Sequence, residues 1–228
     1  PVDGVRPLSP SMDTIGPMAV DVAGLILGMQ LLEPGFAVAA DAGSPRVGRV
    51  RVSAAPEIDD AVTAALRATS WEVTELDPAE WDAATKATGP LLVNEAYQTN
   101  KDLLERDADR ISPDVAARLD SGRNLTPAQL AAATEARERW QATLAALFGR
   151  FDLLVTPVLT IPPPPLDRAT DLLQARSTLP VNLAGVPALA LPVPARGPLP
   201  ASIQLVSAPG TEERLLAAGA VVEAAAAA

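Results

Sequence analysis

The sequence contains no cysteine and no histidine. Without cysteine, the chain cannot form a disulfide, a thiolate metal site or a cysteine nucleophile. Without histidine, it lacks the commonest transition-metal ligand and the usual general base, so an imidazole-based catalytic triad within this chain is impossible. We therefore expect no metal ion and no other cofactor.

Aromatic residues and positive charge are also scarce. Phe, Trp and Tyr make up 3% of the chain, so the core must consist mainly of alanine, valine and leucine. The 18 Lys and Arg residues are outnumbered by 28 Asp and Glu residues, which gives a formal net charge of -10. This acidity argues against nucleic acid and against an anionic membrane as partners, because both require clustered basic residues.

Long apolar runs are absent as well. The longest run is far shorter than the roughly 20 residues that cross a bilayer, and no basic stretch followed by an apolar stretch opens the chain. We therefore expect a cytoplasmic protein. The length of 228 residues favours one large domain over two small ones.

Hydrophobic periodicity predicts a strand–helix–strand unit in the first half of the chain. Residues 46–52 alternate as a strand does, residues 56–66 carry apolar side chains at helical spacing, and residues 71–76 form a second strand pattern. Such a βαβ unit implies a parallel or mixed sheet that is covered by helices. Further strands are predicted at 151–155, 189–195 and 201–207. The predicted fold class is therefore α/β, with a mixed central β-sheet flanked by helices.

Several helices are predicted around these strands. Gly16-Pro17 predicts the start of a helix that continues to Leu32, because proline suits the first helical turn. Residues from about 78 to 150 form a helical subregion, and residues 211–226 form a final helix. Breaks in the helical subregion are predicted near Gly89-Pro90, Ser112-Pro113, Gly122 and Thr126-Pro127.

The stretch LSPSMDTIGPM, residues 8–18, holds two serines that could suggest a nucleophile. Pro10 stands between the two serines, and no Lys or His base lies nearby in the sequence. The chain has only two lysines, Lys86 and Lys101, both in the helical subregion and best interpreted as solvated charges. The sequence contains no Gly-x-Ser-x-Gly or Ser-x-x-Lys pattern. We therefore predict that Ser9 and Ser11 are turn residues, and that Asp13-Thr14 caps helix N–H groups more readily than it shapes an active site.

Four blocks of the sequence are similar to the amidase signature family of serine hydrolases. They occur in the family's order and at about its spacing, and together they cover essentially the whole chain. The blocks are LSPSMDTIGPMAVDVA at 8–23, FDLLVTPVLTIPPP at 151–164, STLPVNLAGVPALALPV at 177–193 and LPASIQLVSAPGTEERLLAAGAVVE at 199–223.

The resemblance implies amide hydrolysis by a Ser nucleophile, a second bridging Ser and a Lys base. In the family, these three residues and a Gly/Ser-rich oxyanion loop precede the block that begins here at residue 8. Residues 1–228 then correspond to the C-terminal portion of a single amidase-signature domain, and we expect this portion to be inactive alone. The alternative is a non-catalytic fragment that acts as a binding or assembly module.

The same resemblance suggests four substrate-binding positions. Tyr97 lies in a helix similar to one that borders the family's substrate cleft, although a core-edge role is the alternative. Thr156 and Leu159 follow a buried strand, where α/β sheets place ligands, with plain loop packing as the alternative.

Ala175 stands where glutamine-using transamidase subunits of the family carry an aspartate that recognises the substrate amine. A glutamine pocket is therefore in doubt, and an apolar or aryl amide is the more plausible small-molecule substrate of the full-length parent. A homodimer is a further expectation.

Overall fold

The computed structural model describes residues 2–39, 43–168 and 177–227. The helices are α1 (Val22–Leu32), α2 (Pro56–Ala68), α3 (Trp81–Arg106), α4 (Pro113–Asp120), α5 (Pro127–Phe148), α6 (Leu179–Ala184) and α7 (Glu212–Ala227), with 3-10 turns η1 (Ala108–Arg110) and η2 (Ser121–Asn124). The strands are β1 (Val47–Val50), β2 (Val73–Leu76), β3 (Leu153–Pro157), β4 (Ala188–Val193) and β5 (Ala201–Val206).

The five strands form one sheet in the order β2-β1-β3-β5-β4. Strands β2, β1 and β3 are parallel, whereas β5 runs antiparallel to both of its neighbours, β3 and β4. The α2 crossover between β1 and β2 produces the parallel pair that the sequence predicted. The predicted α/β class with a mixed central sheet is thus confirmed.

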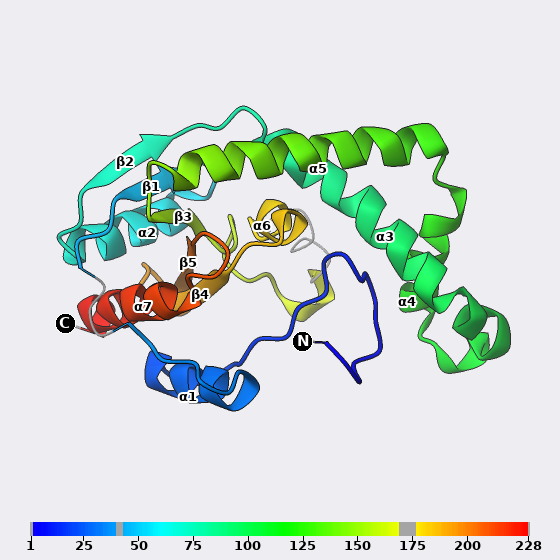
Figure 1. Cartoon of the computed structure of the whole chain (residues 1–228), viewed down its shortest axis with the longest axis horizontal. Helices are drawn as coiled ribbons and strands as arrows, with labels where there is room; N and C mark the ends of the chain where they lie inside the picture. Colours follow the sequence, from blue (N-terminus) through cyan, green and yellow to red (C-terminus); the bar gives the residue numbers. More distant parts are fainter. Residues whose placement is uncertain (1, 40–42, 169–176, 228) are drawn as a thin grey trace.

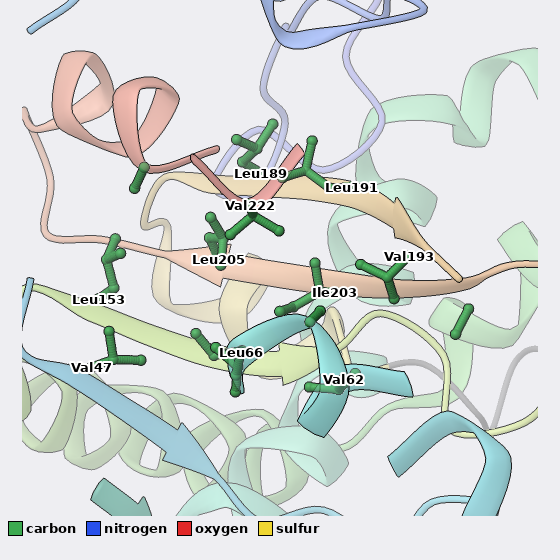
Figure 2. Packing of buried hydrophobic residues seen from close by; sticks show 14 of the residues in the cluster. Val47, Val62, Leu66, Leu153, Leu189, Leu191, Val193, Ile203, Leu205 and Val222 are labelled. Atoms are coloured by element: carbon green, nitrogen blue, oxygen red, sulfur yellow. The ribbon is translucent and has the colours of Figure 1, made fainter. Parts of the chain in front are cut away.

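Helices cover both faces of the sheet (Figure 1). On one face, α2 and α7 enclose a core to which β3 contributes Leu153 and Val155, and Figure 2 shows part of this core. On the other face, α3, α5 and α6 enclose a second core, which includes Leu154 of β3 and Trp140 of α5. The alternation along β3 therefore determines which side chains face which core, because successive residues of a strand point to opposite faces.

Helices α3, α4 and α5 form an arm that extends away from the sheet (Figure 1). The predicted break near Gly89-Pro90 is wrong, because α3 continues through Pro90. The preceding Gly89 has no Cβ to clash with the proline ring. Buried residues on either side of the proline, Ala87 and Leu91, hold the helix in a core that it shares with α5. Here tertiary packing outweighs the local cost of proline.

The first helix begins later than predicted. Residues 16–20 are not helical, and α1 begins at Val22, where the carboxylate of Asp21 accepts the N–H of Gly24 at 2.7 Å. Pro17 lies over the helix instead of inside it, and a Cβ at Gly28 would come within 2.5 Å of its ring. The capping aspartate therefore determines where this helix starts.

Candidate functional site

The serine-rich turn is closed by its own aspartate. The carboxylate of Asp13 accepts the N–H of Leu8 at 2.8 Å and that of Ser9 at 3.0 Å. In return, the carbonyl of Ser9 accepts the N–H groups of Met12 and Asp13, both at 2.8 Å. Asp13 thus caps backbone N–H groups of the turn itself and not those of a helix. Residues 8–13 consequently form a compact loop.

Glu95 of α3 binds this turn from outside. Its carboxylate accepts hydrogen bonds from the Ser9 hydroxyl at 2.9 Å, the Ser11 N–H at 2.9 Å and the Ser11 hydroxyl at 2.5 Å. Arg137 of α5 donates to the Ser11 hydroxyl at 2.7 Å and to the Ser11 carbonyl at 2.9 Å. We call Glu95, Arg137 and the two serines the serine latch. It ties the N-terminal segment to the two long helices of the arm.

The partners of Glu95 in the serine latch stabilise its negative charge. Burial of the Glu95 carboxyl acts to raise its pKa, but the hydrogen bonds from Ser11 and Ser9 and the charge of Arg137 together lower it below its ordinary value. A carboxylate with a lowered pKa is a weak proton acceptor. Lys101, for comparison, lies exposed on α3 and donates to Gln98 at 3.4 Å. The geometry therefore suits Ser11 for holding the turn in place and leaves it without a strong base.

A second polar cluster is buried at the carboxyl end of β3. The amide nitrogen of Gln204 donates to the hydroxyl of Thr156 at 2.8 Å and to the carbonyl of Ser177 at 3.5 Å. All three residues are buried. Among the described residues, the Ser177 hydroxyl has no hydrogen-bond partner. Thr156 and Gln204 are register partners of β3 and β5, so the sheet itself creates this pair.

The predicted substrate-binding residues fall into two neighbourhoods. Thr156 belongs to the buried polar cluster, and the half-buried Leu159 follows it in the loop after β3. Tyr97, in contrast, lies in the helical arm, where the guanidinium of Arg123 in η2 sits 5.4 Å from its ring centroid. Ala175 lies outside the described residues. Thr156 therefore lies within β3 and not after it, Leu159 lies in the loop that follows the strand, and Tyr97 lies in the helical arm.

Sequence reasoning missed three polar residues of these two groups: Glu95, Arg137 and Gln204. Gln204 had a usable signal, because it is a lone amide inside the apolar strand ASIQLVS, where a polar side chain must find a partner if it is buried. The sequence contained no comparable signal for Glu95 or Arg137. They lie 84 and 126 residues from Ser11, on helix surfaces whose sequences contain many other charges.

An open cavity of about 490 Å³ lies at the opposite end of the sheet, beside the start of β3. Asp152 and Arg214 are among its lining residues. The Asp152 carboxylate forms a two-point contact with the guanidinium of Arg46, at 3.0 and 2.9 Å, and this contact lowers the pKa of Asp152. Ligands of α/β sheets normally bind at the carboxyl ends of the strands. This cavity lies at the other end of β3, where a ligand site is not expected.

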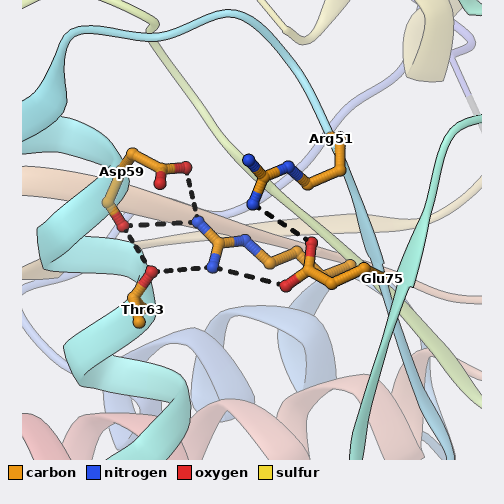
Figure 3. A network of polar contacts seen from close by, with 5 residues as sticks. Arg51, Asp59, Thr63 and Glu75 are labelled. Atoms are coloured by element: carbon orange, nitrogen blue, oxygen red, sulfur yellow. Dashed lines mark hydrogen bonds and ion pairs between the residues drawn. The ribbon is translucent and has the colours of Figure 1, made fainter.

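The buried Arg49 connects β1, α2 and β2, and Figure 3 shows its partners Asp59, Thr63 and Glu75. The Arg49 guanidinium donates to Asp59 at 2.6 Å and to the Thr63 hydroxyl at 2.7 Å, and it lies 3.6 Å from a carboxylate oxygen of Glu75. Arg51 approaches the other oxygen of Glu75 at 3.5 Å. Because the charge of Arg49 is matched by these partners, the network is best explained as a structural support of the βαβ unit.

No helix in residues 2–39, 43–168 or 177–227 is long and apolar enough to cross a membrane. Within the same residues, no group of three or more acidic side chains gathers closely enough to hold a metal ion.

Comparison with known proteins decides the family. Residues 1–216 match the family model described as Amidase. The chain belongs to the amidase family. The A subunit of glutamyl-tRNA(Gln) amidotransferase from Thermus thermophilus is 37% identical over 91 residues, which cover 38% of this chain and 19% of that protein.

Solved amidase-family structures share the fold. A crystal structure of an amidase has a TM-score of 0.82 and 27% identity, and the match covers 96% of this chain and 54% of that one. An inhibitor-bound structure from a vestigial protein complex, which reveals the evolutionary origins of an s-triazine catabolic enzyme, has a TM-score of 0.81 and 25% identity, with 96% and 55% covered. This chain therefore spans about half the length of these amidase-family relatives.

Proposed function

We propose that this chain is the C-terminal part of an amidase that hydrolyses the C–N bond of a carboxylic amide. The Ser-Ser-Lys triad lies in a segment upstream of residue 1. There, a serine oxygen attacks the amide carbon, the amine leaves with a proton, and water releases the acid from the acyl-serine. The present chain contributes scaffold and part of the substrate pocket, and it is inactive alone.

The serine latch is the observation that carries this proposal. The only serines in the family block at residue 8 have their hydroxyls bound to Glu95, whose lowered pKa makes it a poor base. Both hydroxyls therefore fix the position of a loop. A loop fixed in this way is suited to orient the segment that precedes it, and positioning on rigid elements is what an active site requires.

The substrate in this proposal is a small amide that binds without a cofactor. Thr156, in the last part of β3, and Leu159, in the loop that follows, are two of the proposed substrate contacts. Ala175 and Tyr97 of α3 are the other two. An alanine instead of an acidic residue at position 175 favours an apolar or aryl amide over glutamine. The protein is cytoplasmic, and dimerisation of the complete domain is compatible with this assignment.

The experiment is a comparison of two polypeptides on a panel of aliphatic and aryl amides. The 228-residue chain should release ammonia or amine at the rate of buffer. The polypeptide extended upstream in the same reading frame should hydrolyse at least one amide well above that rate. Hydrolysis by the 228-residue chain itself would contradict the proposal, as would an inactive extended polypeptide that is folded.

A further inference from the structure

The cavity beside the start of β3 is not used by the proposed amide chemistry. Its volume of about 490 Å³ falls within the range of small-molecule sites, roughly 300–1,000 Å³. Thr156, a proposed substrate contact, lies in the last part of β3, whereas Leu153 at the first position of the strand lines the cavity. The cavity is therefore separate from the proposed substrate contacts, and its lining must explain what it could bind.

Much of the lining is apolar. Phe148 at the end of α5 and Phe151 just before β3 both line the cavity. Leu153 and Ala218 line it as well, and both belong to the core beneath α7. Small-molecule sites typically combine apolar and aromatic walls with a few polar groups. This part of the cavity consequently suits a ligand with an apolar body.

The carboxylate in the lining, that of Asp152, is already paired. Its Oδ2 accepts the backbone N–H of Arg46 at 2.8 Å and the Nε–H of Arg46 at 3.0 Å, and its Oδ1 accepts from Nη2 at 2.9 Å. The positive charge of Arg46 thus matches the negative charge of Asp152, and both carboxylate oxygens have donors. A cationic ligand would therefore gain little from this carboxylate.

Arg214 brings a positive charge to the cavity from the first turn of α7. Its side chain is exposed, and its charge helps to lower the pKa of Asp152. Among the described residues, no ion pair includes Arg214. The adjacent Glu212 and Glu213 are not part of the described lining. On a chain with a net charge of -10, this cavity therefore presents a guanidinium that an anion can approach.

We propose that this cavity binds a small organic anion, namely a carboxylate attached to an aromatic or branched apolar body. The planar guanidinium of Arg214 matches the two oxygens of a carboxylate, and such two-point pairs are strong and directional. The apolar body then lies against the wall that includes Phe148 and Phe151. This second site goes beyond the proposed function and does not depend on it, because binding there needs no catalytic residue.

Isothermal titration calorimetry of the 228-residue chain with benzoate tests the site. Benzamide keeps the ring of benzoate and removes its charge, whereas acetate keeps the carboxylate and removes the ring. Benzoate should bind saturably, and at least about tenfold more tightly than either analogue, because only benzoate uses both the guanidinium and the apolar wall.

Two substitutions locate the bound benzoate. Arg214→Gln should weaken benzoate binding at least about tenfold, since it removes the charge that pairs with the carboxylate. Arg118→Gln is the matched control, because Arg118 is exposed on α4 and the substitution changes the net charge equally. Ala208→Leu narrows the cavity at a half-buried position and leaves every charge in place, and it should weaken benzoate binding to a similar extent. Circular dichroism spectra of all three variants should match that of the native chain.

The proposal is overturned if the native chain shows no saturable binding of benzoate, or if benzamide binds as tightly as benzoate. Equal weakening by Arg214→Gln and Arg118→Gln would show that benzoate responds only to net charge, and would also refute the site. Inorganic phosphate that binds more tightly than benzoate would refute the organic ligand in favour of phosphate. None of these results bears on amide hydrolysis, so the proposed function can fail while this site stands, and the reverse.

Discussion

Replacing Glu95 with glutamine should loosen the N-terminal segment from the helical arm. The substitution keeps the size of the side chain but removes its negative charge. That charge accepts three hydrogen bonds from Ser9 and Ser11 and attracts the guanidinium of Arg137. Hydrogen bonds to a charged group contribute about 1.5–3 kcal/mol each. Because the Glu95 carboxylate is half-buried and water partly replaces the lost partner, we expect a total loss of about 2 kcal/mol in the free energy of unfolding.

The loss should depend on pH in a defined direction. The folded structure lowers the pKa of Glu95 from its ordinary value of 4.5, so it stabilises the charged form. The contribution is therefore complete well above pH 4.5 and is lost as the pH falls through the pKa of the folded state. Glutamine does not titrate. The difference in stability between the native chain and Glu95→Gln should consequently be largest near pH 7 and shrink below pH 4.5.

Urea denaturation followed by circular dichroism measures this difference, and a parallel thermal scan should show a fall of about 4–8 °C at pH 7. Glu105→Gln is the matched control, since Glu105 is exposed on the same helix. It should change the free energy of unfolding by no more than about 0.5 kcal/mol. If Glu95→Gln matches this control, or if its effect is the same at pH 3.5 and pH 7, the account of the serine latch is wrong.

Three further substitutions test other parts of the structure. Gly122→Ala would place a Cβ 2.0 Å from the carbonyl oxygen of Val93, so η2 must move away from α3, and urea denaturation should show a loss of about 3 kcal/mol. A double-mutant cycle of Gln204→Leu and Thr156→Val should give a coupling energy of about 1 kcal/mol, and additive effects would show that their 2.8 Å hydrogen bond contributes nothing. Arg49→Met should cost about 2 kcal/mol, less than for a fully buried ion pair, because its acidic partners are 42% and 50% exposed; a stabilised variant would contradict this.

The sheet was predictable because its signals are local. Each predicted strand overlaps an observed one, since alternating or continuous apolar residues between turn residues determine a strand over a few positions. Predictions at proline were less reliable. Pro17 was expected inside a helix and lies beside one, whereas Pro90 was expected to end a helix and lies within one. In both cases contacts with distant residues outweighed the local preference.

The serine latch could not be predicted from the sequence. The sequence indicated that Ser9 and Ser11 lie in a turn and lack a lysine base, and the geometry of that turn agrees. It gave no sign that Glu95 would accept their hydrogen bonds, because the contact depends on how the helical arm packs against the N-terminal segment. Long-range pairing of this kind is decided by the fold as a whole, and no spacing in the sequence records it.

Labelling with a fluorophosphonate, which forms a covalent bond with activated serines, tests the central claim most directly. The claim is that this chain carries the scaffold of an amidase and not its nucleophile. Intact-mass measurement should find no adduct on the 228-residue chain, and peptide mapping of the extended polypeptide should locate one adduct upstream of residue 1. An adduct on Ser9 or Ser11 in either polypeptide would contradict the account.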